Sequence, residues 1–370
     1  MLTKAILLTG LMFTVLLHSE AQGINPTYPD VHDPVMAKGD DGRFYVFSTG
    51  MGVSVMSSSD MKTWKKEKDV FTFVPKDGTQ EEDRGRRRPP EADWTKSTIP
   101  HWAVDSVRGY WGHTWAPDII NHNGKWYLYY SCSTFGKNRS AIGVAINKTL
   151  DTSSPDYKWV DEGPVIVSHQ HKDNYNAIDP NLIIDKETGA PYLTFGSFWD
   201  GIQLMRLGDD MKTPVSEPTT IARRIGRKLS LAEIDNVANF TIEGGDTIEA
   251  GENAIEAPFI TYRDGWYYLF VSWDYCCRGR NSTYKTIYGR SRTIDGPYLD
   301  KEGRDMAHGG GNLLVGPCEE FFGIGHCSVY EFDGKWYFLS HAYDVKENGR
   351  AKIFLRELLF DKAGWPYILQ

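Results

Sequence analysis

The sequence predicts an all-β, five-bladed β-propeller in a single domain. Three observations favour this class: a motif that occurs five times, a near absence of amphipathic helical patterns, and an aromatic content of 13 %. The chain has 370 residues, 41 % of them hydrophobic, which is enough apolar material for a large core. Its formal net charge of −8 disfavours a nucleic acid as partner.

The repeated motif is a glycine followed by a short aromatic run that is typical of a β-strand after a hairpin turn. Its five copies occupy residues 42–47, 124–129, 189–194, 265–270 and 334–339. Successive glycines are 82, 65, 76 and 69 residues apart, a spacing that accommodates four strands with long loops. Each copy therefore predicts the central hairpin of one blade.

A second repeated piece lies roughly ten residues before each hairpin glycine, at residues 32–35, 115–118, 178–181, 256–259 and 325–328. In four of the five copies it contains a proline, which suits a strand at a rim because proline donates no ladder hydrogen bond. In a radial arrangement these first strands line a central channel. We expect residues at one shared offset to converge there: Asp33, Ala116 or Trp115, Asp179, Glu256 and His326.

The first 21 residues predict a signal peptide: Lys4 is followed by an apolar run and then by small residues near Ala21. The propeller is expected to span residues 22–370 of an exported, soluble protein that is periplasmic or secreted. The apolar run is too short for a comfortable membrane span, so no membrane association is expected. No partner protein is indicated.

Two blocks interrupt the repeats, at about residues 74–107 and 222–253. Both are polar and are expected to form solvated loops. Five cysteines are present, without the spacing of a disulfide framework or a zinc site. The adjacent Cys276 and Cys277 are compatible with a vicinal disulfide or with two buried thiols.

Three of the residues expected in the channel, Asp33, Asp179 and Glu256, are acids. Unpaired buried carboxylates are costly, so gathering three of them indicates chemistry. Hydrolysis of a glycosidic bond needs one protonated and one ionised carboxyl, and a third acid nearby raises the pKa of the protonated one. The spacing alone does not assign these roles.

An ordered set of motifs resembles the endo-arabinanases of glycoside hydrolase family 43 over nearly the whole mature chain. The motifs occupy residues 32–34, 115–119, 131–138, 176–180, 196–199, 254–258, 276–279 and 325–326. The resemblance implies a five-bladed propeller that cleaves internal α-1,5-linked arabinofuranose bonds of arabinan or arabino-oligosaccharides with inversion. It also implies that Asp33 is the general base, that Glu256 is the general acid, and that Asp179 modulates and orients Glu256.

The same resemblance implies further site residues. It gives His326 as the ligand of a calcium or similar ion in the channel, although Cys327 follows where the family pattern leads us to expect asparagine. Trp115 and Phe135 are expected to stack on the sugar chain. The central sugar is expected to contact His32, Asn176, Ser197 and Trp199.

Other functions are compatible with this scaffold. An exo-acting arabinanase, a β-xylosidase or an α-L-arabinofuranosidase would differ in the loops that close one end of the cleft. A non-catalytic sugar-binding propeller is disfavoured by the three acids, because binding alone needs no carboxyl with a raised pKa. The acids likewise disfavour a propeller that serves as a platform for protein interactions.

Overall fold

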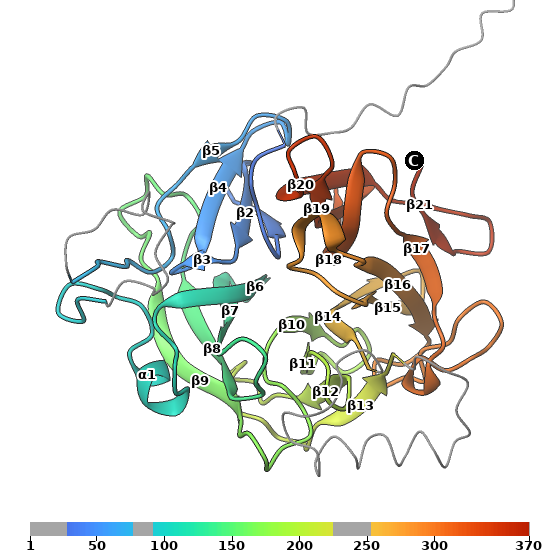
Figure 1. Cartoon of the computed structure of the whole chain (residues 1–370), viewed down its shortest axis with the longest axis horizontal. Helices are drawn as coiled ribbons and strands as arrows, with labels where there is room; N and C mark the ends of the chain where they lie inside the picture. Colours follow the sequence, from blue (N-terminus) through green and yellow to red (C-terminus); the bar gives the residue numbers. More distant parts are fainter. Residues whose placement is uncertain (1–27, 77–91, 225–252, 370) are drawn as a thin grey trace, which may run out of the picture.

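The computed structural model describes residues 28–76, 92–224 and 253–369, and these residues form a five-bladed β-propeller (Figure 1). The predicted signal peptide lies outside the described residues, as do residues 77–91 of the first interrupting block and residues 225–252 of the second. Within the described ranges no helix is long and apolar enough to cross a membrane.

Each blade is an antiparallel sheet whose strands follow one another in the chain, with the first strand nearest the central axis (Figure 1). The strands of blade 1 are β1 (Val35–Lys38), β2 (Phe44–Ser48), β4 (Ser54–Ser58) and β5 (Lys65–Lys66). Those of blade 2 are β6 (His113–His122), β7 (Lys125–Ser133), β8 (Ser140–Asn147) and β9 (Val160–Ser168), and the short β3 (Gly50–Met51) pairs with β6.

The remaining blades follow the same plan. The strands of blade 3 are β10 (Asn181–Ile184), β11 (Pro191–Phe195), β12 (Ile202–Arg206) and β13 (Thr219–Ala222). Those of blade 4 are β14 (Ile255–Arg263), β15 (Trp266–Trp273), β16 (Lys285–Ser291) and β17 (Asn312–Val315). Those of blade 5 are β18 (Phe321–Phe332), β19 (Lys335–Asp344) and β20 (Arg350–Glu357).

The N-terminal segment closes the ring by adding to the outer edge of blade 5. The N–H of Val31 donates to Ala351 O at 3.2 Å, and the N–H of Ile353 donates to Pro29 O at 3.0 Å. The chain then enters β1, so the first and last blades are held together by main-chain hydrogen bonds. A small sheet of β21 (Leu359–Phe360) and β22 (Pro366–Tyr367) follows blade 5.

The predicted hairpins are confirmed, because the five repeated glycines all lie in the turn between the first and second strands of a blade, each with a positive φ. Their aromatic runs form the second strands and supply the core between the blades. Tyr45, Tyr129, Phe195, Phe270 and Phe338 are each at most 1 % exposed.

The expectation that residues 74–107 form a solvated loop is wrong for the described end of this block. Ala92, Ile99, Ala103 and Val107 are buried in the core cluster shared by the first two blades. Ala103 lies in the short helix α1 (Trp102–Ser106), and Val107 directly follows it. Trp102 donates its indole N–H to Asp161 Oδ2 at 3.1 Å. Widely spaced apolar residues in a mostly polar segment give no periodic signal, so composition alone understated their burial.

Candidate active site

The three predicted acids face the channel from blades 1, 3 and 4 and are buried. Asp33 precedes β1, Asp179 precedes β10 and Glu256 is in β14, with exposures of 8 %, 6 % and 8 %. Each strand start is supplied by a different blade, so the propeller gathers carboxyls that are far apart in the chain. The prediction that these acids converge is therefore confirmed.

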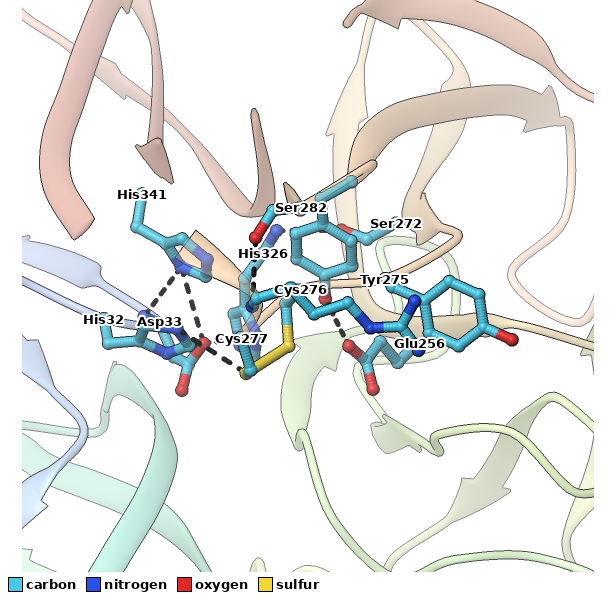
Figure 2. Close-up of a disulfide and its surroundings, with 12 residues drawn as sticks. His32, Asp33, Glu256, Ser272, Tyr275, Cys276, Cys277, Ser282, His326 and His341 are labelled. Carbon is cyan, nitrogen blue, oxygen red and sulfur yellow. Dashed lines mark hydrogen bonds and ion pairs between the residues drawn. A yellow bond between two sulfur atoms is a disulfide. The ribbon is translucent and has the colours of Figure 1, made fainter. Parts of the chain in front are cut away.

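Two histidine side chains hold Asp33 in its charged form (Figure 2). Its Oδ1 lies 2.8 Å from His32 Nδ1 and 3.0 Å from His326 Nδ1, and its Oδ2 accepts the hydroxyl hydrogen of Thr49 at 2.5 Å. Burial by itself raises the pKa of Asp33, but the charges and hydrogen bonds of the two histidines outweigh burial and hold this pKa well below its usual value. Asp33 is consequently a carboxylate at neutral pH.

Glu256 has the opposite electrostatic character. Burial raises its pKa, although hydrogen bonds from Ser197 Oγ and Tyr284 Oη, both at 2.7 Å, favour the ionised form. The pKa of Asp179 is raised well above its usual value, first by burial and then by the nearby charges of Glu256 and Asp33. The site thus contains one carboxylate and two carboxyls that favour retaining a proton, which is the asymmetry that acid and base chemistry needs.

The channel residues share an unusual backbone conformation. Asp33, Ala116, Asp179, Ala257 and His326 all have φ between 43° and 58°, the left-handed region that residues with a Cβ rarely adopt. These five residues mark structurally equivalent positions at the inner end of each blade. The prediction that Glu256 shares the offset of Asp33 and Asp179 is wrong, because Ala257 occupies that position and Glu256 precedes it by one residue.

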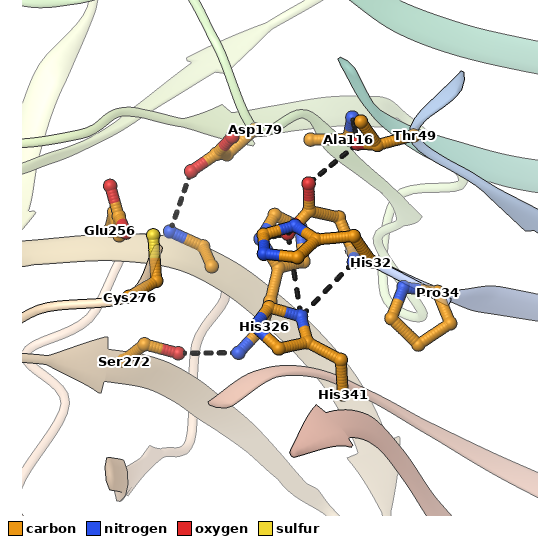
Figure 3. Close-up of polar contacts among 12 residues, drawn as sticks. His32, Pro34, Thr49, Ala116, Asp179, Glu256, Ser272, Cys276, His326 and His341 are labelled. Atoms are coloured by element: carbon orange, nitrogen blue, oxygen red, sulfur yellow. Dashed lines mark hydrogen bonds and ion pairs between the residues drawn. The ribbon is translucent and has the colours of Figure 1, made fainter. Parts of the chain in front are cut away.

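Hydrogen bonds between neighbouring blades hold four of these left-handed residues, and Figure 3 shows the bonds that Thr49 and Ser272 accept. The N–H of Asp33 donates to His341 Nδ1 at 3.1 Å, and the N–H of Ala116 donates to Thr49 Oγ1 at 2.8 Å. In the same way the N–H of Asp179 donates to Ser131 Oγ at 3.0 Å, and the N–H of His326 donates to Ser272 Oγ at 2.8 Å. Each acceptor residue stands seven positions after its blade's hairpin glycine. This spacing is a sequence signal that identifies Thr49, Ser131, Ser272 and His341, which were not predicted as site residues.

Blade 3 departs from this pattern at Gly196, which is the residue seven positions after its hairpin glycine. A Cβ at Gly196 would lie 2.5 Å from Gly201 O, so the backbone approach excludes any side chain there. The N–H of Ala257 therefore donates to Asp179 Oδ2 at 3.1 Å instead. Asp179 thereby fixes the backbone next to Glu256.

His341 is the bulkiest of the four acceptors, and it is fully buried. Its ring stacks on His32 with centroids 3.9 Å apart, and burial together with the charge of His32 holds the pKa of His341 well below its usual value. His32, Asp33 and His341 offer ligand atoms within 4.8 Å of one another, the one such group found in the described part of the chain. The Nδ1 of His341 already accepts the N–H of Asp33, which argues against this group as a metal centre.

The other predicted sugar-binding residues differ in their surroundings. Ser197 contacts Glu256, whereas Asn176 is 4 % exposed and its Oδ1 accepts the hydroxyl hydrogen of Ser140 at 2.6 Å. Trp115 is half-buried and donates to His113 Nδ1 at 2.7 Å, and Trp199 is half-buried as well. Phe135 is 78 % exposed on the turn after β7, where its ring is free to meet a ligand outside the channel.

Comparison with known proteins gives matches over almost the whole chain. The sequence profile of glycosyl hydrolases family 43 matches residues 24–366. An extracellular exo-α-(1→5)-L-arabinofuranosidase from Cellvibrio japonicus is 43 % identical over 339 residues, which cover 92 % of this chain and 86 % of the relative. An extracellular endo-α-(1→5)-L-arabinanase 1 from Bacillus subtilis is 37 % identical over 368 residues, covering 98 % and 95 %.

A solved structure matches to a similar extent. The crystal structure of an exo-1,5-α-L-arabinanase from a bovine ruminal metagenomic library is 51 % identical in sequence, with a TM-score of 0.77. The match covers 93 % of this chain and 98 % of that protein.

The hydrogen bond from Asp179 N–H to Ser131 gives a stability prediction. Replacing Ser131 by Ala leaves a buried N–H group without its acceptor, so the free energy of unfolding is expected to fall by about 1–3 kcal/mol. Urea titration followed by tryptophan fluorescence measures the change, with a Ser59→Ala variant at an exposed position as the control. An unchanged midpoint in Ser131→Ala would remove this hydrogen bond from the forces that hold the blades together.

Proposed function

The chain belongs to glycosyl hydrolase family 43, and from that premise we propose that it is an inverting hydrolase of α-1,5-linked arabinan and arabino-oligosaccharides. The observation that carries the proposal is the opposite electrostatic character of the buried acids. His32 and His326 keep Asp33 ionised, whereas burial favours the protonated forms of Glu256 and Asp179. The names of the related enzymes supply the substrate class.

In the proposed mechanism Asp33 is the general base and Glu256 the general acid. Asp33 accepts a proton from a water molecule as that water attacks the anomeric carbon of the arabinofuranose. Glu256 gives its proton to the glycosidic oxygen as the bond to carbon breaks. Asp179 orients Glu256 through the N–H of Ala257, and the charge of Asp33 disfavours loss of the Glu256 proton.

We further propose endo action, as the motif resemblance implies. Phe135 supports it, because an exposed aromatic ring on the rim offers a stacking surface for sugars beyond the cleaved bond. Exo action is the second candidate. It is favoured by the identities, since the two exo-acting relatives share 43 % and 51 % of residues and the endo-acting one 37 %.

The signal peptide expected at residues 1–21 supports export of the protein, and both curated relatives described above are named extracellular. A periplasmic or extracellular location would bring the enzyme to polymeric arabinan.

A bound cation is proposed at His326, and the donor set fits one. Burial by itself lowers the pKa of His326, but Asp33, Asp179 and Glu256 outweigh burial and raise this pKa to about 9. The same negative field attracts a calcium or similar ion, which competes with the proton for the imidazole. Since His326 Nδ1 pairs with Asp33, Nε2 is the atom left to bind the ion. A bound cation would supply positive charge that moderates the repulsion among the acids.

The proposed reaction is tested on linear α-1,5-arabinan. Endo action releases a ladder of oligosaccharides at the earliest times, whereas exo action releases one short product throughout. Proton NMR of the first product is expected to show the anomeric configuration opposite to that of the substrate.

Asp33→Asn and Glu256→Gln are each expected to lower kcat by several orders of magnitude while the circular dichroism spectrum is retained. A product that retains its configuration, or near-normal turnover in either variant, would refute this assignment.

The hydrogen bond from Tyr284 to Glu256 predicts a shift in the pH profile. The hydroxyl stabilises ionised Glu256, so Tyr284→Phe raises the pKa of the acid further and keeps it protonated to higher pH. The basic limb of the profile of kcat/KM is expected to move up by about one pH unit. Tyr288→Phe, which removes a hydroxyl from β16 in the same blade, is the control. A downward shift in Tyr284→Phe would contradict the proposed role of Glu256.

The proposed ion predicts sensitivity to chelator. Treatment with EDTA is expected to lower both the melting temperature and kcat, with recovery on adding calcium, because an unshielded cluster of acids repels itself. His326→Ala is expected to reproduce both losses and to make the protein insensitive to EDTA. The proposal is wrong if elemental analysis finds no stoichiometric metal and if neither EDTA nor calcium changes the melting temperature or kcat. His326 would then be a hydrogen-bonding residue of the channel.

A further inference from the structure

Cys276 and Cys277 form a disulfide on the loop between β15 and β16, residues 274–284, so the first of the two sequence alternatives is confirmed. Figure 2 shows the sulfur atoms between the side chains of His32 and Asp33 on one side and Glu256 on the other. Cys276 is half-buried and Cys277 is exposed. The disulfide is therefore part of the accessible surface around the acids, and the proposed mechanism does not use it.

One end of this loop is linked to Asp33 by a chain of contacts. The N–H of Cys277 donates to Tyr343 Oη at 2.7 Å, and the same hydroxyl lies 3.0 Å from His32 Nε2. The Cys277 Sγ lies 3.8 Å from the same Nε2 atom. Since the other ring nitrogen of His32 pairs with Asp33, the position of Cys277 bears directly on the histidine that keeps this carboxylate ionised.

The other end of the loop is linked to Glu256. Tyr284 donates its hydroxyl hydrogen to Glu256 Oε1, and its N–H donates to Tyr275 O at 3.1 Å. A second bond, from Thr283 N–H to Tyr275 O at 2.9 Å, joins the same parts of the loop. The residue next to Cys276 is thus tied to the tyrosine that contacts the predicted acid. One loop spans the distance between the two working carboxyls.

The disulfide restricts this loop and changes its surface. Cys277 has φ of 64°, a left-handed conformation that a residue with a Cβ adopts only when its surroundings impose it. Linking adjacent cysteines closes a small ring around that peptide unit and removes two S–H donors. Two bonded sulfur atoms present a polarisable, apolar surface that suits the C–H groups of a sugar ring.

We propose that the Cys276–Cys277 disulfide is a positioning element for hydrolysis: it fixes the loop that joins His32 and Asp33 to Glu256, and it packs against the sugar held between these carboxyls. This inference rests on the proposed function. It makes the two cysteines determinants of turnover and of sugar binding, in addition to their effect on folding.

Reduction of the folded enzyme tests the proposal. Tris(2-carboxyethyl)phosphine converts the disulfide to two thiols while water supplies the oxygen and hydrogens and the phosphine becomes its oxide. Thiol titration in denaturant then counts five thiols instead of the three free ones of Cys132, Cys318 and Cys327. The kcat on linear arabinan is expected to fall about 10- to 100-fold, because small displacements of catalytic groups have effects of this size. Reoxidation is expected to restore it.

The contact with sugar is measured separately from turnover. The KM for arabinotriose is expected to rise several-fold on reduction, since a short substrate depends most on contacts beside the cleaved bond. Circular dichroism at the assay temperature shows whether the fold is retained. A disulfide with a merely structural role would lower the melting temperature and leave both kcat and KM unchanged below it, which would overturn the proposal.

Two variants complete the experiment. A Cys276→Ser, Cys277→Ser double variant is expected to match the reduced enzyme and to be insensitive to the phosphine. Cys318→Ser, which removes a partly buried free cysteine that packs against a core cluster, is expected to match the wild type before and after reduction. If the wild-type enzyme is active and its kcat and KM are unchanged after complete reduction, this inference is wrong and the proposed function stands. Oxidised wild-type enzyme without activity on arabinan overturns the proposed function and this inference with it.

Discussion

The site depends on the left-handed residue at the inner end of each blade. That conformation turns the chain abruptly into the first strand, and its N–H group is then directed at the neighbouring blade, where a side chain accepts it. A buried N–H without an acceptor lowers the stability of the fold, so the left-handed turn is stable only when the acceptor side chain is present. The same contacts that join the blades thus place Asp33, Asp179 and His326 around the channel.

Blade 3 is the exception among these contacts, because it offers no side-chain acceptor at the equivalent position. Close approach of Gly201 O excludes a side chain at Gly196, and the carboxylate of Asp179 accepts the N–H of Ala257 in place of a hydroxyl. An acid of the proposed mechanism therefore also serves as a link between two blades. An amide at position 179 would retain an acceptor oxygen and lose the ability to exchange a proton, which separates these two roles.

Much of the fold could be predicted from the sequence, because the hairpin glycines and aromatic strands recur in all five blades. The convergence of the acids was also predictable, since each precedes or begins a first strand. The correct offset in blade 4 was also readable, because Ala257 directly precedes a proline, as the left-handed residues of blades 1, 2 and 3 do, whereas Glu256 stands one residue earlier. Tyr284 was missed because it lies in a loop without a repeated pattern and reaches Glu256 only through the tertiary fold.

The closure of the ring by blade 5 has a consequence for biosynthesis. Asp33 takes its N–H acceptor, His341, from 308 residues further along the chain, and its partner His326 comes from the same last blade. A nascent chain carries all three acids long before it carries either histidine. Asp33 has His32 beside it in the chain from the start, but it gains its second charge partner, His326, and its N–H acceptor, His341, only when the final blade docks. The site is therefore completed late in synthesis and folding.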